Sequence, residues 1–127
     1  MKVIHFGGEA DCENIEALNS ILTSRHENDS NEFQLYGSEE YPYITILVSS
    51  DWACIHFFED EDDCGHYAYY ANNLLDEDGY TDFYIGSPTA RTEISNKLVI
   101  PFSLALVAAE DFFLLLKRSD KMQWFEL

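Results

Sequence analysis

Two cysteines and two histidines have the clearest potential for chemistry. Cys54 and His56 lie two positions apart, as do Cys64 and His66, and the four residues make a Cys2His2 set of the kind that binds zinc. If the acidic segment between the pairs closes a hairpin that pairs Phe58 with Cys64, then His56 faces His66. A flat sheet face spreads these groups, whereas tetrahedral zinc needs its ligands to converge at about 2.0 to 2.3 Å. We therefore expect no metal site.

A run of five carboxylates at residues 59–63 is a second group with ligand chemistry. An EF-hand calcium loop that begins at Asp60 would place Gly65 correctly at its sixth position, but Cys64 at its fifth and Ala71 at its twelfth do not fit. No spacing orients a Cys, a His and an acid as a nucleophilic site. The motifs GxGxxG, GxxxxGK, HExxH and GxSxG are absent. The sequence therefore predicts no catalytic residues, no cofactor and no enzyme activity.

The charge of the chain is strongly negative and unevenly distributed. Its 127 residues include 24 Asp and Glu against 7 Lys and Arg, which gives a formal net charge of −17. Residues 26–90 hold 15 of the acids and no Lys or Arg. This sign of charge repels phosphate, so direct binding to nucleic acid or to an anionic membrane is not expected. Two loops concentrate the acids, and we expect both to contact a basic protein partner: Glu59, Asp60, Glu61, Asp62 and Asp63, and Asp76, Glu77 and Asp78.

The sequence predicts a cytoplasmic location. Its N-terminal segment has one Lys and a short apolar run broken by Gly7 and Gly8, unlike a secretory signal. The longest apolar stretch, residues 98–116, is interrupted by Pro101, Glu110 and Asp111, so no membrane span is expected. Three cysteines without CxxC spacing fit reduced thiols better than a disulfide framework.

The pattern of apolar and turn residues predicts one domain over residues 1–127. A strand is expected at residues 2–6, followed by a helix that has Asp11 as its N-cap and ends near Arg25. Aromatic and β-branched residues then predict a mostly antiparallel meander at residues 33–36, 43–48, 52–58, 65–70, 81–85 and 92–99.

An almost wholly apolar segment follows Pro101 and predicts a helix buried against the sheet, and residues 122–127 predict a last short strand. The expected fold class is α+β. It has about six to eight strands in a mostly antiparallel sheet, with an N-terminal and a C-terminal helix packed on one face.

Alternation along residues 52–58 separates the two faces of the expected sheet. Ala53, Ile55 and Phe57 would face the helices, and the intervening residues would line the other face. Helices on one side leave that face partly open, and aromatic residues rimmed by acids suit a protein-binding surface. The candidate anchors are Trp52, His56, Tyr67 and Tyr69. The alternative, that loops cover this face and its aromatics belong to the core, fits the sequence equally well.

The C-terminal third resembles a known family. Its features are Pro101 at the start of a helix, Ala105 and Ala108-Ala109 within it, Glu110-Asp111-Phe112-Phe113 toward its end, and Gln123-Trp124-Phe125-Glu126-Leu127 after a polar link. Their order and spacing resemble immunity protein family one of bacterial polymorphic toxin systems. The link at residues 117–121 lacks the Gly and Pro of that family's Thr-Gly-x-Arg-Pro-like segment.

This resemblance implies a small cytoplasmic protein that binds a cognate toxin domain one-to-one and blocks it. Such toxins are often deaminases or nucleases, and the inhibitor needs neither cofactor nor turnover. Phe112 and Trp124 match the family pattern, and we expect them to be structural because a buried helix and a returning strand need large apolar side chains.

The charge and the aromatics leave more than one function open. The acids could occlude the basic active-site region of a nucleic-acid-targeting toxin, with aromatic residues as anchors. An acidic DNA mimic that inhibits a DNA-binding protein explains the charge equally well, although acids bunched in loops differ from an elongated, phosphate-like array. A small zinc-dependent enzyme built on the Cys and His set is a third reading, and it requires stoichiometric metal.

Overall fold

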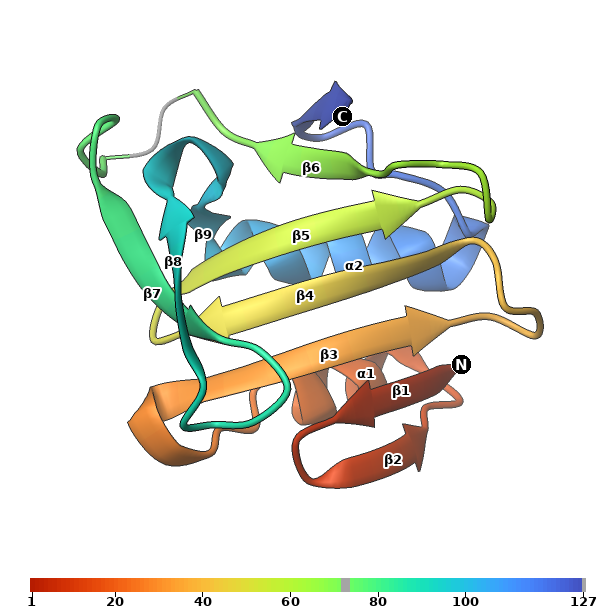
Figure 1. Cartoon of the computed structure of the whole chain (residues 1–127). Helices are drawn as coiled ribbons and strands as arrows, with labels where there is room; N and C mark the ends of the chain where they lie inside the picture. Colours follow the sequence, from red (N-terminus) through yellow and green to blue (C-terminus); the bar gives the residue numbers. More distant parts are fainter. Residues whose placement is uncertain (72–73, 127) are drawn as a thin grey trace.

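An antiparallel sheet of eight strands is the centre of the computed structural model, which describes residues 1–71 and 74–126 (Figure 1). Seven strands follow one another in the spatial order β10 (Gln123–Glu126), β6 (His66–Tyr69), β5 (Trp52–Phe58), β4 (Tyr43–Ser49), β3 (Ser30–Tyr36), β1 (Lys2–His5) and β2 (Gly8–Asp11). The eighth strand, β9 (Ile100–Pro101), pairs with the first residues of β5. All of these pairings are antiparallel.

Two helices, α1 (Ile15–Leu22) and α2 (Phe102–Leu115), pack behind this sheet as Figure 1 is drawn. Alternate residues of the central strands, including Phe33, Ile46 and Ile55, are buried in one cluster with Leu18 of α1 and Phe112 of α2. The predicted α+β fold, with an N-terminal and a C-terminal helix on one face of the sheet, is confirmed. Neither helix in the described part of the chain is long and apolar enough to cross a membrane.

The first helix is shorter than the sequence predicted, and its N-cap is Asn14 rather than Asp11. The Asn14 side chain accepts a hydrogen bond of 2.8 Å from the Ala17 backbone N–H. Asp11 is wrong as the cap because it belongs to β2, where its carboxylate lies 3.3 Å from the N-terminal ammonium of Met1. Gly8, at φ 130°, allows the tight turn that folds β2 back on β1.

The predicted continuous meander is also wrong beyond β6. Strands β7 (Tyr80–Tyr84) and β8 (Arg91–Ser95) form a separate two-stranded sheet, and a short 3-10 helix (Asn96–Leu98) then leads to β9. The physical reason is that no free edge remains beside β6. β10 occupies the outer edge of β6, while β6 and β9 share the outer edge of β5.

The β7–β8 hairpin crosses the sheet face that the helices leave free (Figure 1). Phe83 of the hairpin and Val99 after it are buried against Leu47 and Cys54 of the main sheet, forming a second and smaller apolar cluster. The hairpin thereby covers one end of this face, and its position defines which part of the sheet stays open.

Hydrogen bonds from polar side chains fix the link between α2 and β10. Asp111 of α2 accepts a hydrogen bond of 2.6 Å from the Ser119 hydroxyl, and both its oxygens lie 2.9 Å from Nζ of Lys121. The indole N–H of Trp124 donates to the Ser119 carbonyl at 2.8 Å. The bonds from Lys121, and then from Ser119, hold the pKa of Asp111 below its usual value.

Asp111→Asn is expected to lower the free energy of unfolding at pH 7. A carboxyl whose pKa is depressed in the folded state stabilises the fold above its unfolded pKa and loses that contribution as pH falls through the folded pKa. The stability difference from wild type should therefore shrink as pH is lowered below about 4. Urea unfolding between pH 7 and pH 2.5 measures it, with Asp120→Asn, an exposed neighbour, as the matched charge control. A difference that stays constant with pH would contradict this origin.

Candidate partner-binding surface

Five rings form a continuous row on the open part of the face opposite the helices. The row contains Tyr36 of β3, Tyr43 of β4, Phe58 and His56 of β5, and Tyr67 of β6. Successive ring centroids are 5.1 Å (Tyr36 to Tyr43), 4.7 Å (Tyr43 to Phe58), 4.0 Å (Phe58 to His56) and 4.1 Å (His56 to Tyr67) apart. We call these five residues the aromatic row.

Strand register brings the row together. Tyr36 pairs with Tyr43 and Tyr43 with Phe58, so these three rings stand side by side across three strands. Two residues before Phe58 on β5, and on the same face, His56 pairs with Tyr67 of β6. Cross-strand neighbours on one face are about 5 Å apart, which is the spacing at which flat rings stack.

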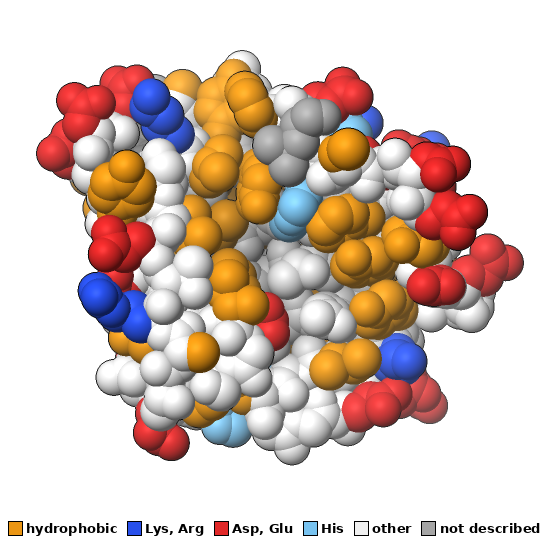
Figure 2. Space-filling view, in the orientation of Figure 1, with side chains coloured by type: hydrophobic (Ala, Val, Ile, Leu, Met, Phe, Trp, Pro, Cys, Tyr) orange, Lys and Arg blue, Asp and Glu red, His pale blue; other side chains and the backbone are white. Residues whose placement is uncertain are grey.

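The sequence allowed two interpretations of this face, that it is open or that loops cover it. Each is correct for part of the sheet. Ala53, Ile55 and Phe57 are buried on the helix side, as predicted. At the other face, the β7–β8 hairpin buries Cys54, while His56 and the rest of the row are half-buried. Figure 2 shows apolar side chains at the surface on both sides of a hollow in this face.

The four predicted aromatic anchors do not form one group. Trp52 packs against the cluster under the hairpin, while Tyr67 touches that cluster and also ends the row. His56 is inside the row, and Tyr69 is half-buried beside β10, where it pairs with Gln123.

The sequence analysis did not single out Tyr36 and Tyr43, and it placed Phe58 on this face without naming it as an anchor, although one signal points to all three. Each is a strand-terminal aromatic next to an acidic turn, and each has the alternation phase of the face away from the helices. Only the pairing of three strands shows that they are adjacent.

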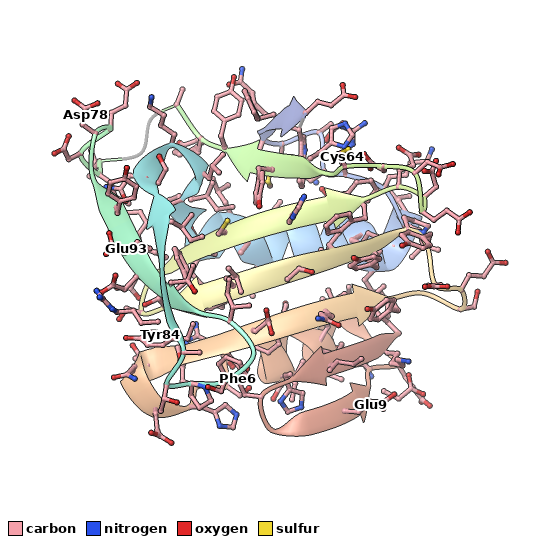
Figure 3. All side chains as sticks on the ribbon, in the orientation of Figure 1. Phe6, Glu9, Cys64, Asp78, Tyr84 and Glu93 are labelled. Atoms are coloured by element: carbon pink, nitrogen blue, oxygen red, sulfur yellow. The ribbon has the colours of Figure 1, made fainter. Side chains whose placement is uncertain are left out.

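The two predicted acidic loops lie at opposite ends of the molecule. In Figure 3, Asp78 is labelled at the upper left, whereas Cys64, which follows the first loop, is labelled toward the upper right. The first loop joins β5 to β6 and exposes Glu59, Asp60, Glu61 and Asp62 at the sheet end where the aromatic row lies. Asp76, Glu77 and Asp78 are exposed where the chain enters β7.

Asp63 differs from the other acids of its loop because it turns inward. Its carboxylate accepts backbone hydrogen bonds of 2.8 Å from both Glu59 and Gly65, and it lies 3.5 Å from Nδ1 of His66. The bonds from Glu59 and Gly65 are the main reason why the pKa of Asp63 is below its usual value. This side chain organises the turn.

The Cys and His residues lie apart. The expected pairing of Phe58 with Cys64 is wrong, because the register pairs His66 with Phe57 and so places His66 on the helix face, away from His56. Burial raises the pKa of the Cys54 thiol to about 12, whereas Cys64 is exposed. Within residues 1–71 and 74–126, no three His, Cys, Asp or Glu side chains come together as a metal site.

The titratable rings of the row are held in their neutral forms. Burial lowers the pKa of His56, since it disfavours the imidazolium between Phe58 and Tyr67. Burial, followed by the negative charge of Glu40, raises the pKa of Tyr36, and burial likewise raises that of Tyr43. At neutral pH the row is therefore an uncharged surface of ring faces and phenol groups.

One comparison with known proteins bears on the whole chain. A protein of Burkholderia cenocepacia (strain H111), named double-stranded DNA deaminase immunity protein, is 25% identical to this chain over 123 residues, and the match covers 96% of each protein. The resemblance to toxin immunity proteins is confirmed. It spans the strands as well as the C-terminal motifs that first indicated it. No protein-family model matches the chain.

Phe112 and Trp124, two of the residues on which the resemblance rests, have structural positions. Phe112 is buried in α2, with its ring 6.2 Å from that of Phe57. Trp124 also packs against Phe57, at the same centroid distance, and its indole N–H holds the link to β10. Both side chains serve the packing of α2 and β10 against the sheet.

Gly65→Ala is expected to destabilise the protein by roughly 3 kcal/mol, because the new Cβ would overlap the His56 imidazole and the backbone has φ 105°. Gly86→Ala is the matched control. It also has a positive φ, of 84°, but open space around it, so we expect a loss of about 1 kcal/mol. Urea unfolding of both variants measures the difference. Equal losses would show that His56 yields freely and that the row is not tightly packed.

Proposed function

We propose that this chain is an immunity protein that binds and neutralises a cognate toxin domain that acts on nucleic acid, a deaminase or a nuclease. The observation that carries the proposal is the full-length match to a protein named as an immunity protein against a double-stranded DNA deaminase. The inhibitor acts one-to-one in the cytoplasm, without cofactor or turnover.

The charge of the chain supports a basic target. An enzyme that acts on DNA or RNA needs a positively charged cleft to hold the phosphate backbone. The four exposed acids at residues 59–62 and the three at residues 76–78 present carboxylates that attract the Lys and Arg of such a cleft. We propose that the bound protein occludes the active-site region and so excludes the nucleic acid.

The carboxylates and aromatics have different tasks in this mechanism. Repulsion within the 59–62 loop is relieved when cations approach, which favours the encounter and orients it. Long residence requires a buried apolar contact, because exposed ion pairs alone contribute little. Aromatic residues of the open face supply that contact, and the predicted anchors His56 and Tyr67 belong to it.

Coexpression with the toxin-like domain encoded beside this gene tests the proposal. Tight one-to-one capture, with growth rescued from a toxin that otherwise stops it, is the expected result. Absence of both capture and rescue would overturn it. Capture of many unrelated DNA-binding proteins, released by free DNA, would instead indicate a DNA mimic.

Reversing Glu59, Asp60, Glu61 and Asp62 to Lys is expected to slow association with the toxin domain about tenfold or more at low ionic strength. The difference should narrow at 0.5 M salt, because screening removes long-range attraction. Stopped-flow or surface-based kinetics measure the rates. The matched control reverses four exposed acids beside the helices, Glu13, Glu16, Glu110 and Asp120, with the same change in net charge. Equal slowing in both variants would show that only net charge matters and that the loop has no orienting role.

A further inference from the structure

The aromatic row lies beside the β7–β8 hairpin and is half-buried, and Tyr67 at its end also touches the cluster beneath the hairpin. The β7–β8 hairpin packs on Leu47 and Cys54, one pleat beyond His56, and α1 and α2 lie on the opposite face. The row crosses four strands, about 14 Å at ordinary strand spacing. A contiguous strip of half-buried aromatic rings on a sheet face is a candidate interaction site.

The row has the composition of an interface centre. Tyrosine combines a large rigid ring with a polar end, and it is enriched among the residues that contribute most to binding. Here lateral stacking already fixes the rings, so little side-chain entropy remains to be lost on binding. Tyr41 extends the strip, with its ring 5.4 Å from that of Tyr43.

Acids border the row along one side. The turn from β3 to β4 exposes Glu39 and Glu40, and the turn from β5 to β6 exposes residues 59–62. The two turns follow Tyr36 and Phe58, so they lie at the same end of the sheet as the row. An uncharged aromatic centre with a carboxylate rim is complementary to a surface rich in Arg and Lys.

A cation already occupies the free end of the row. Nζ of Lys2 lies 5.4 Å from the centroid of the Tyr36 ring, and it also lies 3.8 Å from a carboxylate oxygen of Glu9. This is the geometry of a cation on an aromatic face with an acid beside it. A ring of the row thus already accepts a cation within the protein itself.

A second apolar area, formed by the exposed Leu114, Leu115 and Leu116 at the end of α2, does not define its partner in this way. The hollow beside it is lined by charges of both signs, including Lys2, Glu9 and Asp11.

We infer that the aromatic row, with the rim acids Glu39, Glu40 and residues 59–62, is the surface that docks on the basic nucleic-acid-binding face of the toxin domain. This inference rests on the proposed immunity function and assigns that function to one half of one sheet face. Guanidinium and ammonium groups of the toxin lie against the rings of Tyr36, Tyr43 and Phe58 and pair with the rim carboxylates. The loop at residues 76–78, at the far corner, then acts only at long range.

The decisive variants change the centre of the row. Tyr43→Ala removes the ring between Tyr36 and Phe58, and Thr45→Arg places a cation on the same face without removing any ring, since Thr45 pairs with Gln34 and His56. Tyr43→Phe keeps the ring. Tyr80→Ala is the matched control, because Tyr80 is 65% exposed on β7, outside the row.

Affinity for the catalytically inactivated toxin-like domain encoded beside this gene is measured by calorimetry, and thermal unfolding of each free variant reports its folding. We expect Tyr43→Ala and Thr45→Arg to weaken binding about thirtyfold or more, mainly through faster dissociation, with Tyr43→Phe and Tyr80→Ala within about threefold of wild type. If Tyr43→Ala unfolds, Thr45→Arg alone decides, because it leaves the stacked rings in place.

The outcomes separate this inference from the function on which it rests. Wild-type binding that Thr45→Arg and a folded Tyr43→Ala leave unchanged would overturn the docking surface while the immunity function stands. Loss of binding in Tyr80→Ala instead would move the interface to the β7–β8 hairpin and also overturn it. Failure of the wild-type chain to bind the toxin domain would overturn both.

Discussion

The antiparallel register of β3, β4 and β5 is the constraint on which the rest of the structure depends. Pairings such as Ile46 with Ile55 keep one set of alternate side chains on the helix side, where they make the core. The same register places Tyr36, Tyr43 and Phe58 abreast on the other face. A slip of one residue would exchange the two sets, so the core and the aromatic row are specified together.

The second face has two halves with different roles. Phe83 and Val99 bury the part of the face that lies under the β7–β8 hairpin, whereas the aromatic side chains near the acidic turns are only half-buried. The hairpin can occupy this position because β10 and β9 close the edges to which its strands would otherwise add. Because these edges are occupied, the hairpin lies on the sheet face. Its position there determines how much of the face stays open.

The strong negative charge is compatible with folding because most of the acids are solvated. Exposed turns hold most of the acids of residues 26–90, and the inward-facing Asp63 is compensated by two backbone hydrogen bonds. Asp111, at the end of α2, is compensated by Ser119 and Lys121. The remaining uncompensated charge would be relieved by the basic partner of the proposed function, and this links the composition to the proposed inhibition of a toxin that acts on nucleic acid.

The sequence by itself determined the fold class, the two helices, the facing of residues 52–58 and the resemblance to immunity proteins, because periodicity and local motifs are encoded along the chain. Only the tertiary structure decided the pairing of His66 with Phe57, the assignment of Asp11 to a strand, the covering hairpin and the row that joins Tyr36 to Tyr67. These features depend on which strand edges are free to pair and on a strand register that a shift of one residue would change. Alternation within a single strand carries no information about either.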